Sequence, residues 1–492
     1  MQKKFIFLQL IVVVITCSIL TNCKNHKTKK TTNDSTGVAI HDPTIAGNFS
    51  TQTKIKFDSI EIVSFLNNYP DFKIFEQDLY TFYNKRKYAV AWFDENGMIE
   101  QAANLYNRIQ NISDEGLPDS LLYKAEFTKL MEPDRTTVTN QKPSTATELM
   151  LTAQYLQYAK AVWEGVSEEE SLATDWLIPR KKVSYQQLLD SLATGKDMLN
   201  NDNAPVYRQY ALLKSYLKKY RDINAQNKWQ TISADKKSYK LGDSSVVIGQ
   251  VRENLFLSGD IDSNNQSNKF DKPLQAGVKA FQQRYGYTET GIINATVITQ
   301  LNFPLEKRIE QIMVNMERSR WVPVEPKSNY LIVNIPEYKL HVYEDDTLAW
   351  DMNVVVGKDQ NKTVVFNGDI KYIVFSPYWN VPTSILKAEI EPGIAKNPNY
   401  LAEHNMERIG NTTAVRQKPG LANSLGLVKF LFPNSYNIYL HDSPAKSLFS
   451  QDQRAFSHGC IRVAEPKKLA EYFLRNDSAW SEAKIDFAMK KG

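Results

Sequence analysis

The residues best suited to chemistry lie near the C-terminus, in the run Ser-His-Gly-Cys-Ile-Arg at 457–462. Cys460 in this run is a candidate nucleophile. A free thiol with a pKa of about 8.5 is only a few per cent thiolate at neutral pH, so Cys460 needs a base or a cation beside it. A histidine that accepts the thiol proton can later protonate a leaving amine, which is the chemistry of acyl transfer.

Two histidines are candidates for that base. His458 is two residues before Cys460, and we expect it to face away from the thiol. His441 lies 19 residues before Cys460, at the end of an apolar segment that is typical of a strand. It can approach the thiol only across neighbouring strands, which a β-fold permits. We therefore favour His441 as the base.

The neighbours of Cys460 suggest supporting roles. Gly459 places no side chain beside the nucleophile, so the backbone N–H groups of Gly459 and Cys460 are candidates for an oxyanion hole. Arg462 returns to the face of Cys460 in an extended chain, where it would anchor a carboxylate or hold the loop. A surface ion pair is the alternative for Arg462. A lone thiol can also be buried and inert, so these residues alone leave both readings of Cys460 open.

Composition limits what else the chain can do. Only three cysteines occur, which excludes a disulfide framework and a cysteine-rich zinc site, and the six histidines show no metal-ligand spacing. The 492 residues suggest roughly three domains. A net charge of +5 over this length is too weak to indicate nucleic-acid binding, and an apolar content of 42% excludes a mostly disordered chain.

Residues 1–22 are typical of an export signal, because two lysines precede a mostly apolar stretch, Phe5 to Leu20, that is short for a membrane span. The stretch ends in Leu-Thr-Asn-Cys at 20–23, which resembles a bacterial lipobox with lipidation at Cys23, although Asn22 departs from the usual small residue. A plain secretory signal or an uncleaved anchor is the alternative. We expect the rest of the chain to be exported and anchored by lipid to a cell-envelope membrane, facing the periplasm.

The rest of the chain divides into segments that position these residues. Residues 23–54 are polar and suit a flexible tether. Residues 55–240 carry apolar residues at helical spacing. Residues 243–303 predict three helices, two of which stop at Gly259 and Gly286, and a connecting helix follows at 304–328.

The C-terminal segment, 329–492, has a different pattern. Period-two alternation and β-branched residues predict strands, which we place within 329–345, 347–357, 371–382 and 436–442. Helical spacing returns after residue 465. The stretch at about 384–425 is charged and rich in Asn, Pro and Gly, so we expect it to be an insertion without strands.

Two parts of the chain resemble known families. Residues 246–303 are similar to the three-helix peptidoglycan-binding domain of many cell-wall enzymes, through the Val-Lys-Ala-Phe-Gln run at 278–282 and through Gly291. The Ser-His-Gly-Cys-Ile-Arg run with a histidine 19 residues before its cysteine resembles the signature of the L,D-transpeptidases of YkuD type. The stretches at 376–382 and 416–449 make the resemblance closest to the large YcbB-like branch of that family.

The resemblance implies a multidomain α+β protein. In it, a helical scaffold domain and a peptidoglycan-binding domain precede a mainly β catalytic domain, in which 384–425 forms a cap. The implied site residues are the nucleophile Cys460, the base His441, the oxyanion and loop supports His458, Gly459 and Arg462, and the cleft-lining Tyr378, Trp379 and Asn380.

The implied reaction is acyl transfer between peptidoglycan stem tetrapeptides, which serve as donor and acceptor. A thioester forms on the cysteine, the terminal D-Ala leaves, and a 3→3 cross-link results, with no metal or cofactor. Acylation of the thiol by carbapenems is a further implication. A hydrolase on the same fold and a non-catalytic wall-binding lipoprotein remain the alternatives, and no protein partner is identified.

Overall fold

The computed structural model describes residues 49–132, 143–194, 207, 209–323, 329–345 and 347–491. The expected export signal, Cys23 and most of the tether at 23–54 lie outside these residues. The described helices and strands gather around separate apolar cores, the largest of which lie within residues 49–316, 232–301 and 340–489. No helix in this part of the chain is long and apolar enough to span a bilayer.

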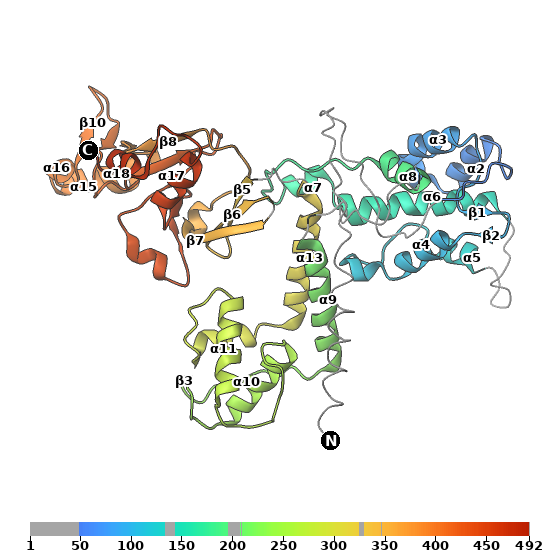
Figure 1. Ribbon diagram of the computed structural model, residues 1–492, viewed down its shortest axis with the longest axis horizontal. Coiled ribbons are helices and arrows are strands. Elements are labelled where there is room, and N and C mark those ends of the chain that lie inside the picture. The colour runs from blue at the N-terminus through green and yellow to red at the C-terminus, as the bar shows by residue number, and fades with distance from the viewer. Residues whose placement is uncertain are drawn as a thin grey trace, which may run out of the picture. The chain divides into compact units, whose positions relative to one another are not determined.

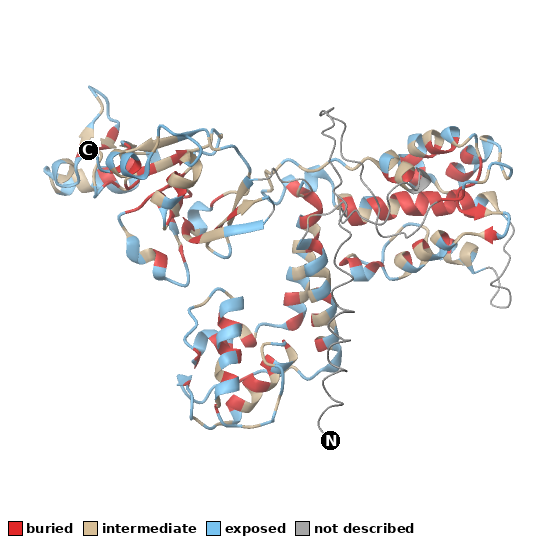
Figure 2. Cartoon of the chain, in the orientation of Figure 1, coloured by how far each residue is buried: buried red, intermediate tan, exposed pale blue. Residues whose placement is uncertain are grey.

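The first core is helical and surrounds one helix that is buried along nearly its whole length. This helix is α6 (Thr145–Ala159), of whose 15 residues 12 are buried (Figure 2). A helix buried on all sides is the centre of a bundle. The other helices that contribute to this core are α2 (Ile60–Asn68), α3 (Glu76–Lys85), α4 (Glu100–Gln110), α5 (Lys124–Met131), α8 (Tyr185–Thr194) and α9 (Gln209–Gln226). The short helix α7 (Glu168–Leu172) lies between α6 and α8 in the chain.

A buried carboxylate, Glu148, joins α6 to an earlier part of the bundle. Its oxygens accept hydrogen bonds from the backbone N–H groups of Ala91 (2.6 Å) and Trp92 (3.0 Å), and the Tyr83 hydroxyl donates to it at 2.7 Å. Burial raises the pKa of Glu148 from its ordinary value of 4.5 to about 7, although these hydrogen bonds lower it.

The second core holds a compact three-helix unit. Its helices are α10 (Val246–Leu257), α11 (Lys272–Arg284) and α12 (Ala295–Leu301), and β3 (Ser238–Tyr239) pairs with β4 (Ile293–Asn294). Side chains of Ser245, Asp271 and Asn294 cap the three helix starts by accepting backbone N–H groups. Gly259 and Gly286 follow α10 and α11 with positive φ, as the sequence predicts.

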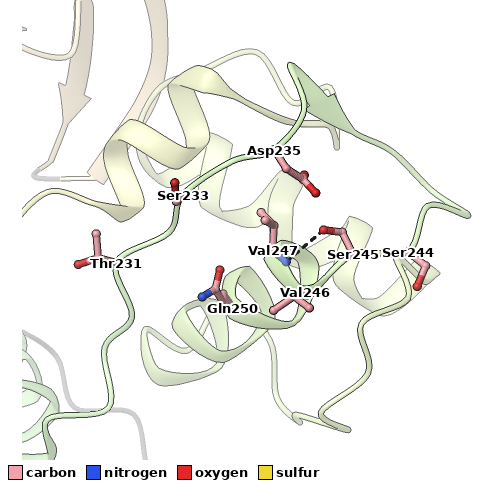
Figure 3. A pocket seen from close by; sticks show the side chains of 8 residues that line it. All are labelled: Thr231, Ser233, Asp235, Ser244, Ser245, Val246, Val247 and Gln250. Atoms are coloured by element: carbon pink, nitrogen blue, oxygen red, sulfur yellow. Dashed lines mark hydrogen bonds between the residues drawn. The ribbon is translucent and has the colours of Figure 1, made fainter.

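An open groove of about 500 Å³ lies beside the start of α10 (Figure 3). All of its lining residues belong to the three-helix unit, so the groove is separate from the residues at 457–462. Hydroxyl, amide and carboxylate groups line it together with two valines: Thr231, Ser233, Asp235, Ser244, Ser245, Val246, Val247 and Gln250.

The next helix, α13 (Leu305–Trp321), lies within the segment predicted as a connecting helix. It packs along α9 (Figure 1), where Tyr220 and Ile223 of α9 share an apolar cluster with Leu305. The two helices are therefore held together by their own apolar contacts.

The C-terminal domain is built on one mixed sheet. The chain order and the spatial order of its strands differ, which brings segments far apart in sequence side by side. The spatial order is β5 (Asn329–Asn334), β6 (Lys339–Glu344), β7 (Thr347–Gly357), β15 (Ile461–Val463), β13 (Leu440–His441), β12 (Val428–Leu431) and β8 (Tyr372–Phe375), with β14 (Ala455–Ser457) also paired to β7.

The side chains of the central strands point alternately to the core and to the opposite face of the sheet. Their apolar residues point to the third core, where α17 (Pro466–Leu474) and α18 (Glu482–Lys490) contribute residues as well. The core members on the central strands are Val428, Phe430, Leu440, Ile461 and Val463. Because successive side chains of a strand point to opposite faces, the residues between them lie on the other side of the sheet.

The predicted multidomain α+β architecture is confirmed.

The prediction that 384–425 lacks strands is wrong. It contains β10 (Met406–Arg408) and β11 (Val415–Gln417), and β11 pairs with β9 (Trp379–Asn380) to form a separate small sheet. Four of its apolar residues, Leu386, Ile390, Met406 and Val415, form a local core that stabilises these short strands. Its first part is helical: α14 (Thr383–Ile385), the π-helical turn η5 (Leu386–Ile390), α15 (Glu391–Lys396) and α16 (Tyr400–Glu403).

Two predicted strands are shorter than expected. The segment 371–382 breaks at Ser376, whose φ of 45° directs β8 into the main sheet and leaves β9 to the small one. In the segment 436–442 only Leu440 and His441 are strand, because Asn437 has a φ of 56°. A single residue with a left-handed backbone conformation thus interrupts a strand even where the sequence alternates between polar and apolar residues.

Glu148 gives a testable prediction about stability. Because its folded pKa lies above its ordinary value, protonation favours the folded state; the stabilisation is complete below about pH 4 and is lost as the pH rises through about 7. The effect is on the order of 3 kcal/mol. We expect the unfolding temperature of the helical bundle to fall from pH 5 to pH 8, and the fall to be much smaller in Glu148→Gln. Calorimetry checks this, and equal falls in the two proteins would contradict it.

Candidate active site

Three neighbouring strands bring residues that are far apart in the sequence into one cross-strand row, which consists of Lys429, His441 and Arg462. β12 pairs antiparallel with β13, which places Lys429 opposite His441, and β13 pairs parallel with β15, which places His441 opposite Arg462. Directly opposed residues lie on the same face of a sheet. Tyr439 and Cys460 immediately precede β13 and β15, so this register also brings them together. The row explains how His441 reaches the neighbourhood of Cys460 across strands.

The Cys460 thiol is enclosed by the chain around β13. Its Sγ donates to the carbonyl oxygen of Asn437 at 3.5 Å. Burial raises the pKa of the Cys460 thiol, whereas hydrogen bonds from the Tyr439 backbone and hydroxyl lower it, as do the charges of Arg462 and Lys429. The raised pKa means that Cys460 is protonated at neutral pH in the free protein.

His441 is buried and uncharged. Burial and then the positive charge of Arg462 lower its pKa to about 4. Its Nδ1 lies 2.5 Å from the Asp442 carbonyl oxygen, and the tautomer in which Nδ1 donates leaves a lone pair on Nε2. Among the described residues, the hydrogen bonds of the Cys460 thiol involve Asn437 and Tyr439 rather than His441. The His441–Cys460 pairing therefore remains a prediction.

Hydroxyl groups fix the loop that carries Cys460. Thr363 Oγ1 donates to the Gly459 carbonyl at 2.8 Å and accepts the N–H of Gly357 at 2.9 Å. Ser457 Oγ donates to the Cys460 carbonyl at 2.6 Å and accepts the N–H of Gly459 at 3.1 Å. The Gly459 N–H is thus already satisfied. The role of the Gly459 N–H in an oxyanion hole stays a prediction, and it would require this hydrogen bond to Ser457 to open.

His458 is directed to the insertion. Its Nε2 forms a 2.9 Å hydrogen bond with Oε1 of Glu389, which belongs to η5. Strand alternation does not explain this orientation, because residues two apart in an extended chain share a face. The chain turns between them instead, since Gly459 has a φ of 115°, a conformation that favours glycine. The contact links the Cys460 loop to the inserted segment.

Arg462 stands in the row with an unsatisfied donor. Its Nε is buried and has no hydrogen-bond partner among the described residues. The same part of the chain gives it no carboxylate partner, so a surface ion pair does not describe Arg462 there. Its guanidinium remains available to an anion.

Of the three expected cleft residues, Trp379 and Asn380 form β9 of the small sheet, and Tyr378 immediately precedes it. The ring of Tyr378 lies under the Arg416 guanidinium, 4.3 Å from its centroid. Trp379 packs on the local core of the insertion, and Asn380 stands opposite Arg416 in the β9–β11 pair. Trp379 is thus partly buried, whereas Tyr378 is exposed, and substrate binding by these residues stays a prediction.

Sequence reasoning missed Lys429 and Tyr439. Tyr439 is two residues before His441, so strand alternation alone would have put it on the same face. Lys429 is the one charged residue in the otherwise apolar β12, which is a weaker signal. Its place opposite His441 follows from strand pairing, and no local pattern predicts that.

The hydroxyl of Tyr439 gives a second prediction. In a form spanning 24–492, Cys460 is the only cysteine, so iodoacetamide reports on it alone. We expect the reaction rate to keep rising above pH 8, because burial raises the thiol pKa. Tyr439→Phe removes one hydrogen bond to the thiolate and should move the midpoint to higher pH, whereas Tyr436→Phe should not. Mass spectrometry follows the alkylation, and identical profiles for all three proteins would contradict the assignment.

Related proteins and structures are known. A putative L,D-transpeptidase of Haemophilus influenzae is 33% identical over 194 residues, which cover 36% of this chain and 39% of the length of that protein. An L,D-transpeptidase structure from Xylanimonas cellulosilytica is 14% identical and covers 50% of this chain and 94% of its own, with a TM-score of 0.15. One from Stackebrandtia nassauensis is 13% identical and covers 49% and 92%, with a TM-score of 0.22.

Family models match three parts of the chain. A scaffold domain matches residues 77–217, and a putative peptidoglycan-binding domain matches residues 252–301. The L,D-transpeptidase catalytic domain, YkuD, matches residues 328–480, which include the whole row from Lys429 to Arg462. The chain thus joins a scaffold domain and a peptidoglycan-binding domain to a catalytic domain of the YkuD L,D-transpeptidase family.

Proposed function

We propose that this protein is a peptidoglycan L,D-transpeptidase that forms 3→3 cross-links between stem peptides. The observation that carries the proposal is the cross-strand row, which gathers Cys460, His441 and Arg462 on one face of the sheet within the matched catalytic domain. The peptidoglycan-binding domain supports peptidoglycan as the substrate. Its groove (Figure 3), with hydroxyl and amide groups beside two valines, suits a glycan or peptide backbone.

In the first half-reaction, the sulfur of Cys460 attacks the carbonyl carbon of the third stem residue while His441 takes the thiol proton. The bond to the terminal D-Ala breaks, the leaving amine takes the proton from His441, and a thioester remains. Because both groups are neutral at rest, the proton moves only as the sulfur attacks. Burial of His441 supports this order, since a charged imidazole would be costly there.

In the second half-reaction, a side-chain amine of another stem peptide attacks the thioester. The amine loses a proton to His441, the C–S bond breaks, and the proton returns to the sulfur of Cys460. The backbone N–H of Cys460 is the candidate donor to both oxyanions, since that of Gly459 is held by Ser457. A carbapenem would acylate the same sulfur.

The proposed location follows from the N-terminal sequence. An apolar segment that ends in a lipobox-like run would place a lipid on Cys23, and the polar tether would let the folded part reach the cell wall. We propose a lipoprotein that is anchored to a cell-envelope membrane and faces the periplasm.

The nucleophile is tested directly. Purified disaccharide-tetrapeptide is incubated with the 24–492 form, and intact protein and products are weighed by mass spectrometry. We expect a thioester on Cys460 and a dimer that lacks one D-Ala. Cys460→Ala should lower turnover by a factor on the order of 10³ or more, and His441→Gln should also lower it strongly.

The products separate the alternatives. If tripeptide forms without dimer, the protein is a hydrolase on the same fold and not a transferase. Cross-linking by Cys460→Ala would show that the nucleophile is wrong. If the wild type forms neither adduct nor product, the non-catalytic wall-binding lipoprotein becomes the favoured alternative.

The contact between His458 and Glu389 tests whether the insertion controls access of the donor. Glu389→Gln removes the charge that holds His458, and we expect KM for the donor to change about two- to threefold, as befits one exposed pair. The matched control is Glu391→Gln, an exposed neighbour on the same segment. Steady-state kinetics measure the effect, and equal KM values in all three proteins would argue against gating through this contact.

A further inference from the structure

The catalytic row contains a positive charge that the mechanism above does not use. Lys429 stands opposite His441, and His441 stands opposite Arg462, so the neutral histidine lies between two cations on three adjacent strands. Valine residues occupy the same row on both outer strands: Val374 on β8 and Val355 on β7. The row is therefore apolar at both ends and carries its charge at the centre.

Neither cation is neutralised by a carboxylate in the part of the chain that the structure describes. Lys429 is partly buried, and its Nζ lies 5.6 Å from the centroid of the Tyr439 ring. Within the described residues neither Lys429 nor Arg462 forms an ion pair, and the Arg462 Nε has no acceptor. Burial lowers the pKa of Lys429, while the negative charge of a Cys460 thiolate raises it, so its ammonium lies close enough to sense the sulfur. Burying unpaired charge costs free energy, which an anionic ligand would recover.

The donor offers such an anion at the right place. In a tetrapeptide, the residue after the scissile bond is the terminal D-Ala, so its carboxylate lies within one residue, about 3.5 Å of chain, of the carbonyl that Cys460 attacks. A donor with a further residue, or with an amide at its end, would present a neutral group there instead.

We propose that Lys429, together with Arg462, binds the terminal carboxylate of the donor stem peptide and thereby selects donors that end one residue beyond the scissile bond. The inference rests on the proposed function and names a specificity residue of the same site. The carboxylate departs with D-Ala when the thioester forms. Lys429 therefore acts in the first half-reaction and not in the second.

The test compares two donors, disaccharide-tetrapeptide and the same compound with its terminal carboxyl converted to an amide. Initial rates of thioester formation on Cys460 give kcat/KM for each donor. We expect the wild type to prefer the free acid by at least about tenfold, Lys429→Met to reduce that preference to about twofold or less, and Lys429→Arg to keep most of it. Lys371→Met, an exposed lysine at the start of the β8 region, is the matched control and should behave as the wild type.

The ratio separates binding of the carboxylate from an effect on the thiol. If Lys429 served only to stabilise the thiolate, Lys429→Met would slow both donors by the same factor, and that result would overturn the proposal. An unchanged preference in Lys429→Met would overturn it as well. Lys429→Gln, checked for a wild-type unfolding temperature, replaces Lys429→Met if the latter does not fold.

The second half-reaction gives an independent check. Acyl-enzyme formed in advance should transfer to an acceptor at the same rate in the wild type and in Lys429→Met, because the carboxylate has already left. A slower transfer would contradict the assignment. If the wild type forms no thioester with the tetrapeptide, the proposed function fails and this inference with it, whereas thioester formation without donor preference defeats the inference alone.

Discussion

The parallel pairing of β13 with β15 is the constraint on which the proposed catalytic face depends. Because side chains alternate along a strand, a slip of one residue would turn His441 into the core and Leu440 out of it. The apolar residues Leu440 and Ile461, which stand opposite each other in the core, oppose such a slip. The register that brings His441 beside Arg462 is thus fixed by contacts on the other side of the sheet.

A buried carboxylate stabilises the adjacent pairing of β13 with β12. Asp442, directly after β13, accepts the backbone N–H groups of Leu427 and Ser443 and pairs with Lys446. These bonds tie the turn after β13 to the start of β12, which holds Lys429 and His441 on adjacent strands. Position in this site comes from backbone and core contacts, which leaves the side chains of the row free for chemistry.

The charges of the row residues suit the proposed binding of an anionic substrate. Burial disfavours the charged forms of His441 and Cys460, whereas Lys429 and Arg462 have no carboxylate partners in the described chain. Such a face suits the anionic group that we propose for the donor.

The sequence by itself determined which residue types are available for the proposed chemistry and most of the elements that carry them. Cys460, a histidine at a strand end, helical spacing and glycine stops are local features, and local features survive in any arrangement of the chain. The tertiary structure decided which residues meet. Lys429 and Tyr439 join the row through strand register, Ser457 occupies the Gly459 N–H through a turn, and β10 and β11 form because the insertion has its own core. These outcomes depend on contacts between segments far apart in the chain, and the pattern of any one segment does not contain them.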